Sequence, residues 1–170
     1  MKCYIYLFRH GVTSDNSEGV FSGWRDSKLN SRGRRDAKIV ALRLKNKKVG
    51  IAFQSHLSRS RDTLKEVLKF HPECRKIIQD DRIIERNYGK LQGRTHLEIA
   101  EKYGSGIYDK WHRSYNARPP AGESFKDIEK RVLSFIRDLL KLMKKEKINV
   151  AISAHGNSMR PFRRYFEKLS

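Results

Sequence analysis

Apolar residues along the chain alternate between short continuous runs and helical stripes. The runs are rich in β-branched and aromatic residues and stop abruptly, so they predict buried β-strands. These runs are 2–8 (KCYIYLF), 49–54 (VGIAFQ), the short 76–79 and 149–153 (NVAIS). Between them, apolar residues recur every three or four positions, which predicts helices. The helical stripes cover 31–44, 58–70, 125–143 and a last basic segment, 158–166.

Helix start and stop signals agree with this pattern. Asn30 or Ser31 can cap one helix, Pro72 ends the next, and Ser124 with Asp127 resembles a capping box. Strands that alternate with helices are typical of parallel sheets with helices on both faces. We therefore predict an α/β fold, a three-layer sandwich in which a largely parallel central sheet is flanked by helices.

Residues 80–122 break the alternation. Glycine and proline punctuate this stretch, and its apolar positions follow no clear period. Long irregular stretches inside compact domains usually carry a binding surface or a lid. No repeat, linker or low-complexity segment divides the chain. We expect residues 1–170 to form a single domain in which 80–122 is an irregular insertion that covers the substrate.

Composition excludes several classes of protein. The 170 residues are 38% apolar and 34% charged, and the N-terminal apolar run is too short for a membrane span or a signal peptide. Cys3 and Cys74 give neither a disulfide framework nor the spacing of a metal site. These features predict a cytoplasmic protein with no membrane partner.

The charge balance predicts an anionic partner. Thirty-eight Lys and Arg residues against 19 Asp and Glu residues leave a net charge of +19. Nucleic acid, anionic lipid and phosphorylated metabolites are the anions that so basic a chain could bind. The segment 163–166 mixes arginine with aromatic residues, which suits nucleic acid, although most charge runs on helices are solvated faces.

Polar residues follow three of the predicted strands. They form the segments 9–11 (RHG), 55–59 (SHLSR) and 155–158 (HGNS). Ligands of parallel sheets bind beyond the carboxyl ends of the strands, so these segments should converge. Their histidines and arginines would make an anion site that contains a possible nucleophile.

This combination suits phosphoryl transfer. A neutral imidazole can attack phosphorus, arginines can hold the phosphate oxygens, and a second histidine can donate to them. The chain has neither a P-loop pattern nor a carboxylate cluster for magnesium, so the arginines must themselves balance the phosphate charge. Glu85 is the candidate general acid for the leaving oxygen. Simple ion pairing of Glu85 with Arg82 or Arg86 is the alternative.

Five motifs follow one another along the chain. They are 9–11 (RHG) with Asn16 and 21–24 (FSGW), then 55–60 (SHLSRS), 85–93 (ERNYGKLQG), 111–115 (WHRSY) with Pro119-Pro120, and 154–160 (AHGNSMR). Together they resemble the histidine phosphatase superfamily, and most closely its cofactor-dependent phosphoglycerate mutase branch. The resemblance extends from Tyr6 to about Phe166, and five motifs in order are highly specific.

The resemblance implies a role for each matched residue. His10 becomes the phosphorylated nucleophile, Arg9, Arg59 and His155 form the phosphate pocket, and Glu85 donates and accepts the proton. The positions that would hold phosphate or substrate are Asn16, Ser22, Gly23, Tyr88, His96, His112, Arg113 and Asn157.

The implied reaction interconverts 3-phosphoglycerate and 2-phosphoglycerate through a phosphohistidine. A trace of 2,3-bisphosphoglycerate would prime the enzyme, and no metal is implied. The partner is then a small phosphorylated metabolite, and the related mutases, often dimers or tetramers, make a homo-oligomer an expectation.

Three departures keep other functions open. Family mutases usually have Lys at the position of His96 and Arg at that of His112, and typical members continue beyond Ser170 into another strand and a mobile tail. A phosphatase of a small phosphomonoester, using the same phosphohistidine, is therefore the first alternative. A basic nucleic-acid-binding protein on the same fold is the second, although the complete set of catalytic residues argues against it.

Overall fold

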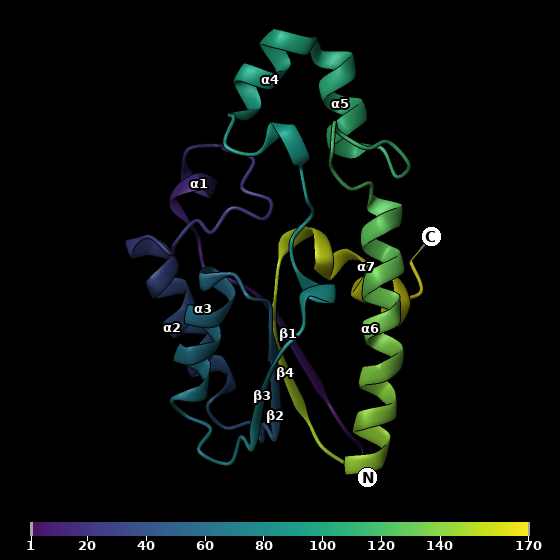
Figure 1. Ribbon diagram of the computed structural model, residues 1–170. Helices are drawn as coiled ribbons and strands as arrows, with labels where there is room; N and C mark the ends of the chain where they lie inside the picture. The colour runs from purple at the N-terminus through teal and green to yellow at the C-terminus, as the bar shows by residue number, and fades with distance from the viewer. Residues whose placement is uncertain (1, 170) are drawn as a thin grey trace.

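A parallel β-sheet lies at the centre of the molecule, in a computed structural model that describes residues 2–169 (Figure 1). Its strands are β1 (Ile5–Arg9), β2 (Ile51–Gln54), β3 (Lys76–Gln79) and β4 (Val150–Ala154). The strand order is β1-β4-β2-β3, and every neighbouring pair is parallel. The predicted strands and the parallel sheet are confirmed, with boundaries shifted by up to three residues.

Helices cover both faces of the sheet, as predicted. α2 (Ser31–Leu44) and α3 (Ser58–Leu68) pack on one side, and α6 (Phe125–Glu146) and α7 (Gly156–Glu167) pack on the other (Figure 1). Asn30 caps α2 by accepting a hydrogen bond from the Gly33 N–H, and Ser124 and Asp127 form the predicted capping box of α6. No helix in the described part of the chain is long and apolar enough to cross a bilayer.

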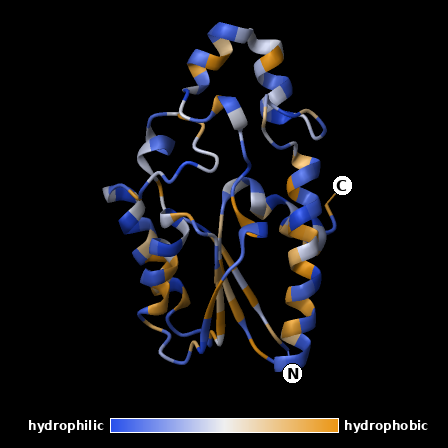
Figure 2. Cartoon of the chain, viewed as in Figure 1, coloured by the Kyte–Doolittle hydropathy of each residue, from blue (hydrophilic) through white to orange (hydrophobic). Residues whose placement is uncertain are grey.

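Two apolar clusters hold the layers together. Successive strand residues point to opposite faces, so Val150 and Ile152 pack toward α6 while Ala151 packs toward α2 and α3. The Phe135 ring of α6 lies edge-on to Phe53 of β2, with 5.2 Å between ring centroids. Figure 2 shows the resulting pattern, with hydrophobic colour on the strands and on the helix faces that meet them.

The region 80–122 is more ordered than the sequence predicts. It contains two short 3-10 helices, η1 (Asp81–Ile83) and η2 (Gly89–Leu91), followed by α4 (His96–Tyr103) and α5 (Ser105–Arg113). The prediction of an irregular stretch is therefore wrong for most of it. A Thr95–Glu98 capping box starts α4, and Gly104 at a φ of 81° lets the chain turn into α5. Neither helix is long enough to show a clear apolar period.

A small apolar cluster of its own supports this region. Phe21, Tyr88, Leu91 and Ile99 are buried together, and Trp111 packs against them. Figure 1 shows α4 and α5 as a hairpin above the sheet, on the side where the strands end. A further short helix, α1 (Ser14–Ser17), follows β1 and was not indicated by the sequence pattern.

We expect Phe135→Ala to lower the free energy of unfolding by about 3–5 kcal/mol, because it leaves a cavity between the sheet and α6. Urea unfolding measures this change. Leu42→Ala, at an exposed position of α2, is the control and should change the free energy by less than about 0.5 kcal/mol. Equal losses in the two variants would contradict the assignment of Phe135 to the core.

Candidate active site

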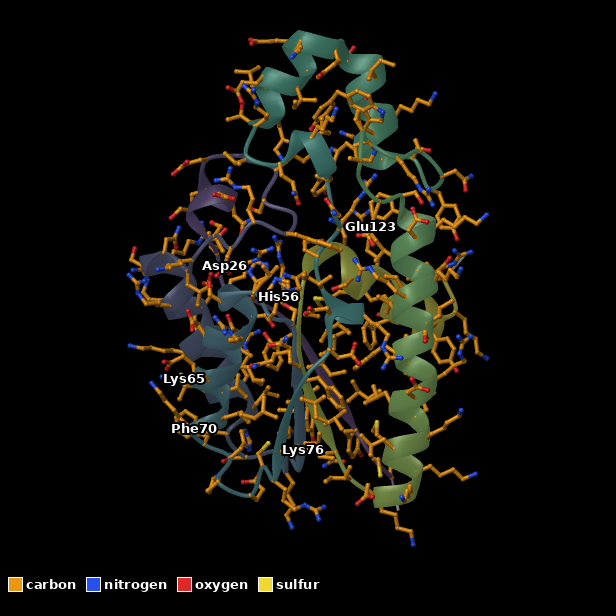
Figure 3. All side chains as sticks on the ribbon, in the orientation of Figure 1. Asp26, His56, Lys65, Phe70, Lys76 and Glu123 are labelled. Carbon is orange, nitrogen blue, oxygen red and sulfur yellow. The ribbon has the colours of Figure 1, made fainter. Side chains whose placement is uncertain are left out.

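The pairing of β1 with β4 determines which residues meet at the end of the sheet. Arg9 lies opposite Ala154 in the register, and the His10 N–H donates to the Ala154 carbonyl (3.1 Å). The residue that follows each of these two strands is a histidine. Because the strand ends lie side by side, the rings of His10 and His155 are 4.9 Å apart between centroids. In Figure 3, His56 marks this end of the sheet and Lys76 the opposite one.

His10 is buried and has one nitrogen free for chemistry. Its Nδ1 lies 2.7 Å from the Gly11 carbonyl oxygen, which can only accept, so the proton sits on Nδ1 and Nε2 carries the lone pair. Burial, with help from the positive charges of Arg59 and Arg9, lowers the pKa of His10 to about 3. The ring is therefore neutral at pH 7, as a nucleophile must be.

His155 is fully buried, and Ser55 fixes the direction of its ring. The Ser55 hydroxyl lies 2.8 Å from His155 Nε2 and accepts a hydrogen bond from the Leu57 N–H (3.4 Å). His155 Nδ1 is buried and has no partner within the described residues. Burial, followed by the charges of His10 and Arg59, holds the pKa of His155 well below 6.5. Ser55 is a positioning residue that the predicted site lacks.

Arg59 is a buried cation held by backbone carbonyls. Its Nη1 donates to the Arg25 carbonyl and its Nη2 to the Gly23 carbonyl, both at 2.7 Å. Gly23, whose carbonyl accepts from Nη2, adopts a φ of 51°, a conformation that favours glycine. The Nε of Arg59 is buried without a partner in the described chain, so its N–H remains for a ligand. Arg9 lines the same cavity.

Glu85 is fixed at both its side chain and its backbone. Its Oε1 accepts from the backbone N–H groups of Arg86 (2.7 Å) and Asn157 (3.2 Å). Its carbonyl accepts from the Trp24 indole (2.7 Å) and from Arg131 of α6 (2.9 Å). The carboxylate is thus held against the first turn of α7, beside the two histidines.

The neighbouring arginines do not form ion pairs with Glu85. Arg82 binds Asp80 and Asp138 instead. The buried Arg86 guanidinium donates to the carbonyls of Trp111 (2.8 Å) and His112 (3.2 Å), where it ties the end of α5 to the segment of the general acid. The geometry favours a functional carboxylate at Glu85 over a structural ion pair.

A cavity of about 340 Å³ joins these groups. The predicted residues that line it are Arg9, His10, Asn16, Ser22, Gly23, Arg59, Glu85, Tyr88, His96, His112 and Asn157. His96 and His112 come from α4 and α5, so the hairpin that they form contributes one wall. Burial lowers the pKa of both histidines, and this wall is largely neutral at pH 7.

Two predicted residues, His155 and Arg113, do not line the cavity, and one cation of its lining was not predicted. His155 is fully buried beside the His10 ring. Arg113 is exposed and pairs with Asp109 (3.1 Å), away from the cavity lining. Arg160 of α7 lines the cavity instead. Its position three residues after Asn157, on the same helical face, is the signal that could have identified it.

The charge of the cavity favours an anion over a metal ion. His10, Glu85 and His155 each offer an atom within 4.8 Å of the others, which is close enough to share a metal ion. Arg9 and Arg59 stand beside them and would repel a dication. The first turn of α7 adds N–H groups that favour negative charge.

Comparison with known proteins agrees with this site. Residues 5–170 match the model of the histidine phosphatase superfamily (branch 1), and the chain belongs to that superfamily. The 2,3-bisphosphoglycerate-dependent phosphoglycerate mutase of Cytophaga hutchinsonii is 36% identical over 98% of this chain and 78% of its own.

Two solved structures have the same fold. Bacillus stearothermophilus YhfR has a TM-score of 0.86 and 29% identity, over 98% of this chain and 80% of its own. A mycobacterial glucosyl-3-phosphoglycerate phosphatase has a TM-score of 0.84 and 25% identity, over 96% of this chain and 79% of its own. Relatives of this fold thus include proteins named as mutases and as phosphatases.

The buried histidines predict an acid-sensitive fold. Because its folded pKa is lowered, His155 binds a proton in the unfolded chain below pH 6.5 while the folded chain does not. Stability is therefore full above pH 6.5 and falls on acidification, by about 1.4 kcal/mol per pH unit for each such histidine. Urea unfolding between pH 7 and 5 should show a slope for His155→Asn that is shallower by about this amount. Leu42→Ala, at an exposed position of α2, removes no titratable group and should keep the wild-type slope.

Proposed function

We propose that this protein is a phosphoglycerate mutase that interconverts 3-phosphoglycerate and 2-phosphoglycerate through a phosphohistidine at His10. The observation that carries the proposal is a neutral, buried imidazole with a free Nε2, held between two arginines and a carboxylate. The 36% identity to a mutase over nearly the whole chain supports the choice of reaction.

The first step is attack of His10 Nε2 on the phosphorus of the donor. A bond forms between Nε2 and phosphorus as the bond from phosphorus to the leaving oxygen breaks. The Gly11 carbonyl accepts a hydrogen bond from the Nδ1–H group (2.7 Å) and stabilises the positive charge that the ring acquires. Removing that acceptor would destabilise the phosphoenzyme.

Fixed donors stabilise the charge on the transferring phosphoryl group. Arg9 and the free Nε of Arg59 would bind its oxygens, and His155, whose Nδ1 has no partner within the described residues, would donate to another. Because these donors are held by buried contacts before the substrate arrives, little reorganisation is needed during the reaction.

Glu85 would move the proton in both directions. Protonated, it donates to the leaving oxygen; ionised, it accepts the proton of the hydroxyl group that attacks phosphohistidine. Its hydrogen bonds to Arg86 and Asn157 use Oε1, so Oε2 is free for the transfer.

The cavity fits a bisphosphorylated primer. It has permanent cations in Arg9, Arg59 and Arg160, and its volume of about 340 Å³ suits a small metabolite. When bound, 2,3-bisphosphoglycerate supplies the phosphoryl group that loads His10. Arg9, Arg59 and Arg160 would hold this primer, and the proposed reaction uses no metal.

The neutral wall favours a second candidate, a phosphatase of a small phosphomonoester. His96 and His112 carry little charge at pH 7, which weakens the attraction for a second acidic group. Such an enzyme would release phosphate when water attacks the phosphohistidine. The mycobacterial phosphatase has a similar fold.

The remaining expectations follow from the proposed reaction. The partner is a small phosphorylated metabolite, the reaction belongs to glycolysis and gluconeogenesis, and the location is cytoplasmic. A dimer or tetramer stays a prediction. Nucleic-acid binding through residues 163–166 is disfavoured, because Arg163 pairs with Glu167 and Arg164 with Glu129.

Two variants test the chemistry. His10→Ala should abolish phosphoenzyme formation, because it removes the atom that accepts the phosphoryl group. Glu85→Gln should slow transfer by about 10²–10⁴-fold and leave phosphate binding intact, because the amide cannot donate and accept the proton in turn. Acid-quenched labelling with phosphate-labelled substrate measures the covalent adduct. Stoichiometric phosphoenzyme in His10→Ala would refute the mechanism.

Phosphorus NMR separates the two candidate reactions. The wild type is incubated with 3-phosphoglycerate and a catalytic trace of 2,3-bisphosphoglycerate, and both isomerisation and phosphate release are followed. We expect 2-phosphoglycerate to form at a rate that depends on the trace. Free phosphate without isomerisation would identify a phosphatase and exclude the mutase.

A further inference from the structure

Two histidines face each other on the wall that α4 and α5 contribute to the cavity. His96 is the first residue of α4 and His112 lies in the last turn of α5, and their rings are 5.1 Å apart between centroids. Both line the cavity that contains His10. They form a pair of titratable groups within the reach of a bound ligand.

The surroundings of this pair are aromatic and leave one nitrogen unsatisfied. The Phe21 ring lies 4.0 Å from His96 and 5.8 Å from His112, between ring centroids. The Tyr108 hydroxyl is within 3.1 Å of His96 Nδ1. His112 Nδ1 is buried with no partner in the described chain. A buried polar atom without a partner is an unusual feature that a ligand can satisfy.

The charged groups that act on His112 are cations from three directions. Arg113 is its neighbour on α5, Arg160 belongs to α7, and Arg86 comes from the segment before η2. Burial, followed by His96 and these cations, holds the pKa of His112 below 6.5, and burial does the same for His96. The carboxylate that lines the cavity, Glu85, is engaged by the N–H groups of Arg86 and Asn157.

We propose that recognition at the subsite of His96 and His112, where the family resemblance already implies substrate contacts, is proton-linked: the second acidic group of the substrate binds there together with a proton taken up from solvent. The inference rests on the proposed function, because it assumes a substrate with a phosphate and a further carboxylate or phosphate. Arg9 and Arg59 hold the transferring phosphate at any pH. The histidine pair recognises the other acid only in its protonated form.

Proton uptake follows from the placement of the pair. An anion beside the imidazoles favours their charged form, so the complex has a higher histidine pKa than the free protein. Below the pKa of the free protein, the subsite is already charged and affinity is greatest. Between the histidine pKa of the free protein and that of the complex, affinity falls about tenfold for each unit of rising pH and for each proton bound. Above the pKa of the complex, the contribution of the pair is lost.

The test compares two ligands in one protein. We would measure binding of 3-phosphoglycerate and of glycerol 3-phosphate by calorimetry between pH 5.5 and 8, in buffers with different ionisation heats. Both ligands carry a phosphomonoester, and only the first carries a carboxylate. The ratio of their affinities should rise about tenfold as the pH falls by one unit through the titration of the pair, with net proton uptake for 3-phosphoglycerate alone.

Variants assign the effect to the pair. The double variant His96→Lys, His112→Arg carries permanent cations, so its affinity ratio should stay high and change little with pH. His56→Asn, outside the cavity, should behave as the wild type. Proton NMR of the wild-type histidine rings gives a second readout that needs no variant: the pKa of the pair should rise with 3-phosphoglycerate and not with glycerol 3-phosphate.

The outcomes separate this inference from the proposed reaction. A wild-type affinity ratio that does not change with pH, or no binding of 3-phosphoglycerate at any pH, would overturn the subsite. Proton-linked binding without isomerisation would support the subsite and reject the mutase. Isomerisation without proton-linked binding would support the mutase and reject the subsite.

Discussion

The parallel pairing of β1 with β4 is the constraint on which the site depends. It places the residue after each strand side by side, so that His10 and His155 meet although 145 positions separate them in the sequence. The same pairing removes both rings from water. Burial and the adjacent cations then keep the imidazoles neutral, as the proposed nucleophile His10 must be.

Buried arginines bonded to backbone carbonyls hold the loops around this pair. Arg59 binds the loop that contains Gly23, Arg86 binds the end of α5, and Arg131 binds the carbonyl of Glu85. Each guanidinium has several donors in a rigid plane and can join segments that share no regular structure. The loops thereby gain fixed positions, and the interior gains the positive charge that attracts phosphate.

The cavity therefore has two chemically different parts. Near His10, arginines provide charge that does not change with pH. On the wall formed by α4 and α5, His96 and His112 provide charge only when they are protonated. Under the proposed function, a substrate with one phosphate would use the first part alone, and a substrate with two acidic groups would use both. The balance between mutase and phosphatase chemistry would then depend on the second part.

The sequence by itself determined the sheet, its flanking helices and the residues around His10, because strand ends and helix caps leave strong local signals. It did not determine the two helices within 80–122, which are too short to show a period and depend on contacts with Phe21 and Tyr88. Tertiary structure alone decided that Arg113 does not line the cavity and that Ser55 orients His155. Such choices depend on the direction of each side chain in the folded chain, which local sequence does not encode.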